Sequence, residues 1–151
     1  MLRLICLALA TAMGLAALAN GLVMLASPES WYGAVPGVTT TGPFNQHFIR
    51  DIGLIFLLVG AAFLAGAAKP NLRIALWTLP TLWLSGHALF HLWEVATGIS
   101  AHSAMARDFP AVTFPALIGI ALTIWAWDNR TGSLSMPLGI GRPIVADRQP
   151  G

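Results

Sequence analysis

Charged residues are scarce in this sequence. Only 9% of its 151 residues are Asp, Glu, Lys or Arg, and 56% are hydrophobic. Soluble domains average roughly a quarter charged residues, because charge covers a surface that faces water. The composition therefore excludes most soluble classes and predicts a surface that faces lipid. The basic residues are scattered and the net charge is only +2, so nucleic-acid binding is not indicated.

Cysteine and the common enzyme motifs are also lacking. The single Cys6 excludes an internal disulfide framework and a cysteine-based metal knuckle. It lies within an apolar run, which is typical of a small hydrophobic residue. The sequence contains no G-x-S-x-G turn, no evident serine–histidine–acid set and no phosphate-binding glycine loop. We therefore predict no catalytic residue, and enzymatic activity is the less favoured expectation.

Long hydrophobic runs dominate what is present. An α-helix needs about 20 apolar residues to cross the hydrocarbon core of a bilayer. Four stretches approach this length, namely residues 4–26, 46–68, 72–97 and 110–127. They predict an all-α fold, a bundle of four transmembrane helices within residues 1–130. Residues 131–151 are rich in Gly, Pro and charge and predict a flexible cytoplasmic tail.

The first stretch has an alternative interpretation. Arg3, the apolar run and the small residues around Ala17 and Ala19 also resemble a signal peptide with its cleavage site. However, the apolar run continues to Ala26, which a cleaved signal does not require. We favour an uncleaved helix; cleavage would leave three spans.

The charges between the stretches predict the orientation. In a four-span protein one side receives most of the basic residues, which are Arg3, Lys69, Arg73, Arg130, Arg142 and Arg148. The other side receives Glu29 and the adjacent Arg107 and Asp108, which we expect on the solvated surface of a loop. Cytoplasmic loops carry an excess of Lys and Arg. The sequence thus predicts a multi-pass protein of the cell (inner) membrane with both termini in the cytoplasm.

Five histidine, aspartate or glutamate residues lie inside the predicted spans. His47 and Asp51 are four residues apart at the start of the second span, and His87, His91 and Glu94 follow an i, i+4, i+7 spacing near the end of the third. At about 100° per residue, the latter three fall within an arc of roughly 60° on one helix face. Such residues are costly in lipid and usually face a bundle interior, where they carry function or pair with one another.

The alternating directions of the spans predict that these five residues gather near the outer face. The second and third spans are joined by a short turn, so we expect them to be antiparallel neighbours. Asn20, near the outer end of the first span, and Arg50 would extend the cluster as a supporting polar network.

Three interpretations of the cluster remain open. His, Asp and Glu are ligands for zinc, iron or copper, and two histidines such as His47 and His91 can hold a haem b. A second interpretation is a proton or small-ligand site. The third is a purely structural network in which Arg50 pairs with Glu94 and Asp51 with a histidine. The His-x-x-x-His spacing lacks the adjacent Glu of the zinc-protease motif.

The segment before the second span, residues 30–43, is punctuated by glycine and proline. It predicts either an ordinary connector or a lid that folds back over the polar cluster. The connector is the favoured interpretation, because most surface loops only connect helices.

Residues 42–53, GPFNQHFIRDIG, together with the later His87, His91 and Glu94, resemble a family of small uncharacterised four-helix membrane proteins from bacteria. The size and layout are also similar to the broad DoxX-like group, but that group's distinctive residues are absent. The resemblance implies a fold and a location and brings no activity. The expected partners are the lipid bilayer and either further copies of the chain or other membrane subunits. Rival functions are an accessory subunit of a larger membrane complex and a component of a small proton-linked transporter.

Overall fold

The computed structural model describes residues 1–130, and the predicted tail lies outside these described residues. Every regular element in this part of the chain is helical. The long elements are α1 (Leu2–Ala26), α3 (Gln46–Ala68), α4 (Arg73–Ala96) and a final stretch made of α5 (Ser103–Asp108), the π-helical segment η3 (Phe109–Thr113) and α6 (Phe114–Arg130). The short elements are α2 (Pro28–Ala34) and the 3₁₀ turns η1 (Val38–Thr40) and η2 (Pro70–Leu72).

Three of the described helical stretches are long and apolar enough to cross a membrane. They are Leu2–Ala26, Gln46–Ala68 and Ser103–Arg130. The prediction of an all-helical protein with membrane-spanning helices is thus confirmed at this level. α4 is also 24 residues long but is not among the three, and it contains Arg73, two histidines and Glu94. The fourth span remains a prediction.

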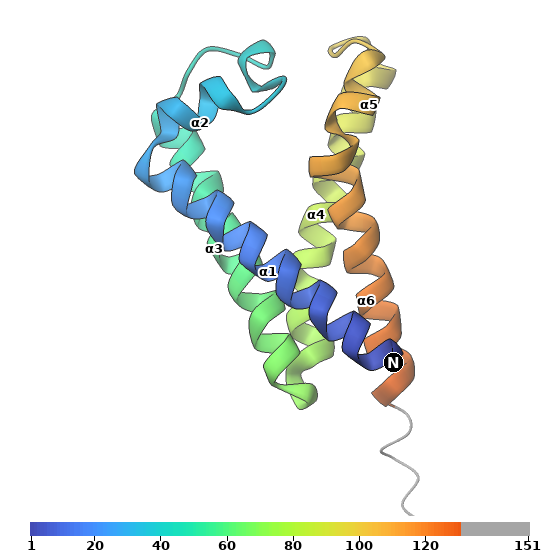
Figure 1. Ribbon diagram of the computed structural model, residues 1–151. Coiled ribbons are helices and arrows are strands. Elements are labelled where there is room, and N and C mark those ends of the chain that lie inside the picture. Colours follow the sequence, from blue (N-terminus) through green and yellow to red (C-terminus); the bar gives the residue numbers. More distant parts are fainter. Residues whose placement is uncertain (131–151) are drawn as a thin grey trace, which may run out of the picture.

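The long helices form two pairs. α1 packs mainly against α3 and α4 mainly against α6, while α3 and α4 join the pairs. Figure 1 shows that the pairs meet at a narrow end, which holds the N-terminus, the α3–α4 turn and the end of α6. They diverge toward a wide end, where α2 lies on one pair and α5 on the other.

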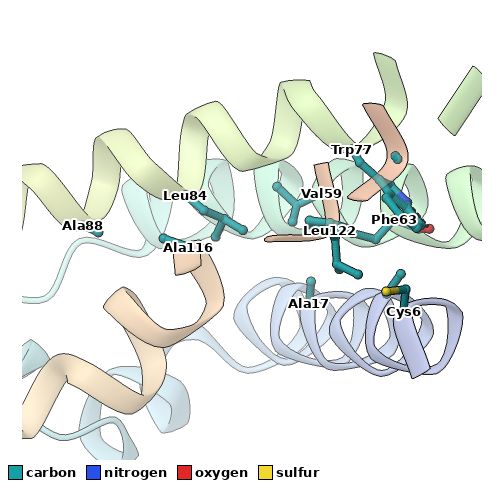
Figure 2. Close-up of a cluster of buried hydrophobic side chains, with 11 residues drawn as sticks. Cys6, Ala17, Val59, Phe63, Trp77, Leu84, Ala88, Ala116 and Leu122 are labelled. Carbon is teal, nitrogen blue, oxygen red and sulfur yellow. Dashed lines mark hydrogen bonds between the residues drawn. The ribbon is translucent and has the colours of Figure 1, made fainter. Parts of the chain in front are cut away.

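The hydrophobic core joins the two pairs toward the narrow end. Figure 2 shows Phe63 of α3, Trp77 of α4 and Leu122 of α6 close together, with Cys6 of α1 beside them. Trp77 is fully buried, and its indole nitrogen donates a 3.1 Å hydrogen bond to the carbonyl of Phe63. A buried indole N–H needs such a partner, so this tryptophan fixes how α4 sits on α3.

Glycines allow α1 and α3 to touch through their backbones. A Cβ added to Gly60 would lie 2.6 Å from the carbonyl oxygen of Gly14, and one added to Gly21 would lie 2.7 Å from that of Gly53. Small residues at such crossings allow close van der Waals packing, which is a main source of helix association in lipid. The seven-residue spacing of the glycines in both helices explains why this pair forms one continuous contact.

Two arginines donate hydrogen bonds to the last carbonyls of a preceding helix. Arg50 of α3 donates from Nε to the Leu25 carbonyl in the last turn of α1, at 3.1 Å. Arg73, the first residue of α4, donates to the carbonyls of Gly66 and Ala67 at 2.9 and 3.0 Å. The last four carbonyls of a helix lack intrahelical partners, and each of these arginines donates to such carbonyls. Both arginines therefore stabilise helix ends.

Candidate functional site

The histidine of α3 forms an exposed pair. His47 Nε2 lies 3.2 Å from Asp51 Oδ2, and the two side chains are 88% and 56% exposed. Both lie at the start of α3, on the α1–α3 pair at the wide end of the bundle. An exposed pair with this geometry contributes little to stability, typically well under about 1 kcal/mol.

His91 of α4 has a more enclosed partner on another helix. His91 Nδ1 lies 3.1 Å from Asp108 Oδ2, with the side chains only 26% and 15% exposed. Asp108 comes into reach because the final helical stretch begins already at Ser103, before the predicted span. The sequence analysis predicted Asp108 on the solvated surface of a loop and did not predict it as the partner of His91.

Arg107 determines how Asp108 and His91 share a proton. Its Nε and Nη2 donate to the two oxygens of Asp108 at 2.6 and 3.1 Å, which is the arrangement of an ionised carboxylate. An ionised carboxylate can only accept, so His91 Nδ1 carries the proton that it donates to Asp108. In the neutral ring Nε2 is then an acceptor, and it makes no hydrogen bond with any residue of the described part of the chain.

A row of rings leads from this site into the bundle. The rings of His91 and His87 meet edge to face with centroids 4.7 Å apart. His87 stacks on Trp83 at 5.3 Å, and Trp83 meets Phe56 of α3 edge to face at 5.3 Å. These ring contacts link His91 to Phe56 of α3 and so connect the site to the junction between the two helix pairs.

A small pocket opens beside the His91–Asp108 pair. Its volume is about 260 Å³. The polar side chains of its lining are His91, Asp108 and Thr113, and the others are Leu92, Val95, Ala104, Met105 and Phe109. A concave, mostly apolar surface with a few convergent polar groups is the usual form of a small-molecule site.

The loop before α3 contacts this site. Gly37 has a left-handed backbone with φ of 87°, and the guanidinium of Arg107 occupies the space that a Cβ would need. The loop is tied down by the Tyr32 hydroxyl, which donates a 2.6 Å hydrogen bond to the Gly42 carbonyl. The predicted segment 30–43 thus reaches across to Arg107, which binds Asp108. None of its residues lines the pocket, so the lid interpretation stays a prediction.

The structure therefore divides the predicted cluster. His87 and His91 lie together, whereas His47 and Asp51 lie on the other helix pair, because the pairs diverge toward the wide end (Figure 1). Among the described residues, no three His, Cys, Asp or Glu side chains are placed to hold a metal ion together. The expected gathering of all five residues does not occur in this arrangement.

The supporting residues have other partners. Asn20 accepts a 2.8 Å hydrogen bond from the Trp31 indole and so ties α1 to α2. Arg50 caps α1 instead of pairing with Glu94, whose half-buried carboxylate forms no hydrogen bond or ion pair within residues 1–130. Arg107 and Asp108 were not predicted as site residues. The one signal for them in the sequence is that two adjacent charges stand directly before an apolar run.

No family model, curated protein or solved structure matches this chain. The resemblance to small bacterial four-helix membrane proteins stays a prediction.

Proposed function

We propose that this chain is a four-span protein of the cell membrane that binds a small ligand through His91 near the outer face. The observation that carries the proposal is the 3.1 Å contact between His91 and Asp108 at the edge of a pocket of about 260 Å³. Ionisable side chains in membrane helices are costly and usually serve a function. In this chain the ionisable side chains His91 and Asp108 form an ordered pair, and a pocket lies beside them.

The topology rests on the length of α4 and on the distribution of charge. A helix of 24 residues is roughly 36 Å long at 1.5 Å per residue, enough to cross a hydrocarbon core of about 30 Å. Of the six basic residues in the described part of the chain, four lie at the narrow end, Arg3, Lys69, Arg73 and Arg130, and two lie toward the wide end, Arg50 and Arg107. By the positive-inside rule this end faces the cytoplasm, with both termini there, and the wide end with His91 faces outward.

The chemistry of the pair suits ligand recognition. Asp108 holds the imidazole in one orientation and one tautomer, as carboxylates do for functional histidines in many proteins. In the neutral imidazole, His91 Nε2 is then a hydrogen-bond acceptor with a fixed orientation. Arg107 holds Asp108 in turn, so the acceptor is oriented before any ligand arrives, which lowers the entropic cost of binding.

The metal and haem hypotheses have less support from this geometry. The described residues offer pairs, His47 with Asp51 and His91 with Asp108, whereas a protein metal site commonly uses three or four ligands. A bis-histidine haem through His47 and His91 would need the two helix pairs to close at the wide end. The accessory-subunit and transporter hypotheses have no observation of this kind in their favour.

The proposal is tested by what the protein carries when purified. The wild type, His91→Phe and the matched control His47→Phe are isolated in mild detergent, and their bound small molecules are extracted and compared by mass spectrometry. We expect a compound that is present in the wild type and in His47→Phe and depleted in His91→Phe. Equal extracts from all three would refute the proposal. Elemental analysis of the same samples tests the rival: stoichiometric iron, copper or zinc that is lost in a His47/His91 double alanine variant would establish a metal site instead.

A further inference from the structure

The charge of the pocket limits what it binds. Its lining contains one carboxylate, Asp108, and the guanidinium of Arg107 offsets that charge through two hydrogen bonds. With a neutral imidazole the group has no net charge. An ion brought to this place would lose its hydration shell without gaining an opposite charge, which is strongly unfavourable. The pocket therefore favours an uncharged ligand.

The polarity of the hydrogen bond adds a second restriction. The two Asp108 oxygens are already engaged by Arg107 and His91. The group of the pair that is left for a ligand is Nε2 of His91, an acceptor in the neutral ring. A ligand that completes this site must therefore supply a donor, such as a hydroxyl group. A ketone, an ester or an ether has only acceptors and leaves Nε2 unsatisfied.

The size of the pocket and the side chains around it limit the ligand further. A cavity of about 150 Å³ is enough to hold benzene, so about 260 Å³ fits a ring or short chain with substituents but not a large molecule. Three apolar side chains of the lining, Leu92, Met105 and Phe109, are 42%, 50% and 44% exposed on the helix surface. On helices that lie in lipid, exposed apolar side chains of this kind face the hydrocarbon, so an apolar ligand in the bilayer would meet them first.

From these restrictions we infer that the ligand is an uncharged, membrane-dissolved alcohol or phenol. Its hydroxyl donates to His91 Nε2, and its apolar part passes between Leu92, Met105 and Phe109 toward the lipid. The inference rests on the ligand-binding function proposed above and adds the chemical class of the ligand.

The test uses two probes that differ in one proton donor. Full-length protein labelled with ¹⁵N-histidine is placed in lipid nanodiscs, and 4-hexylphenol or its methyl ether 4-hexylanisole is added at matched membrane concentrations. The His91 resonances are identified by their loss in His91→Phe. We expect 4-hexylphenol to shift the Nε2 resonance saturably and the ether to leave it unchanged. We also expect phenol binding, followed by a neighbouring methyl resonance, to be about tenfold weaker in His91→Phe, as loss of one hydrogen bond requires.

The outcomes separate this inference from the function on which it rests. Equal shifts with both probes, or no shift with either, overturn the alcohol or phenol assignment. If ethylene glycol from the water phase shifts Nε2 while 4-hexylphenol does not, the site binds ligands but not from the membrane, so the inference fails and the function stands. If the spectrum shows Nδ1 of His91 unprotonated, the Asp108-held acceptor does not exist and the proposed function fails with it.

Discussion

Gly37 lies directly against the guanidinium of Arg107, although the two residues belong to opposite helix pairs at the wide end. The contact is close enough that even a methyl group on Gly37 would overlap with the arginine. Since Arg107 holds Asp108, and Asp108 holds His91, the loop before α3 is connected by contacts to the proposed ligand site. The loop and the site should therefore respond to the same substitutions.

Gly37→Ala should loosen this contact. A non-glycine residue costs about 1–2 kcal/mol in the left-handed backbone region, and the new methyl group must push Arg107 aside. We expect a lower thermal midpoint in detergent and a changed ¹⁵N spectrum of His91. Gly33→Ala is the matched control, since a Cβ there would meet nothing within 4 Å. If both variants behave alike, the loop does not contact Arg107.

Gly60→Ala should weaken the packing of α1 on α3. The added Cβ would lie 2.6 Å from the Gly14 carbonyl and 2.7 Å from the Leu18 side chain, so the helices must separate. Overpacking of this kind costs about 1–3 kcal/mol. The free energy of unfolding, measured by SDS titration in mixed micelles, reports the loss. Gly86→Ala, in an open position of α4, should instead be neutral or slightly stabilising. A Gly60→Ala protein as stable as Gly86→Ala would contradict the close crossing.

Arg73→Met should destabilise the α3–α4 turn. Arg73 is 9% exposed, and its two hydrogen bonds satisfy carbonyls at the end of α3. Hydrogen bonds to a charged group contribute about 1.5–3 kcal/mol each, so we expect the loss of both to cost about 3 kcal/mol or more in the same titration. Lys69→Met removes a nearby exposed basic residue and should change the stability by less than about 0.5 kcal/mol. If both variants lose similar amounts of stability, the positive charge accounts for the loss, and not the hydrogen bonds from Arg73 to the end of α3.

The positions of the helices follow closely from the sequence. Hydrophobic length predicted helices over 4–26, 46–68 and 72–97, and the structure has Leu2–Ala26, Gln46–Ala68 and Arg73–Ala96. The reason is physical: without water, every apolar run in a bilayer must satisfy its own backbone, and a helix does this locally. The breaks at Pro28 and Pro70 are likewise local effects of the proline ring.

The site could be predicted only in part, because it depends on how the helices cross. The i, i+4 spacing correctly placed His87 next to His91. It could not show that the glycine contacts between α1 and α3 make one tight pair, that the pairs diverge, and that His47 is carried away from His91. The contact between Asp108 and His91 was not predicted from the sequence. It depends on how the helical turns that begin at Ser103 are rotated toward α4, whereas the sequence predicted a loop there.

The two histidine–aspartate pairs should differ in energy. A double-mutant cycle with His91→Phe and Asp108→Asn should give a coupling of about 1 kcal/mol or more, because both partners are largely enclosed. The corresponding cycle with His47→Phe and Asp51→Asn should give less than about 0.5 kcal/mol, since that pair is exposed to solvent. Equal couplings would remove the energetic distinction between the two pairs and with it one reason to place the site at His91.

The topology can be decided by labelling single cysteines. In a Cys6→Ala background, Ser30→Cys, Lys69→Cys and His102→Cys each place one thiol at an exposed position between long helices. If α4 spans the membrane, Lys69 and His102 lie on opposite sides. A membrane-impermeant maleimide added to right-side-out vesicles should then label positions 30 and 102, and position 69 only after permeabilisation. If α4 does not cross, positions 69 and 102 must label alike, whichever way the protein faces. Such a result would leave three spans and would put the two ends of the described chain on opposite sides of the membrane.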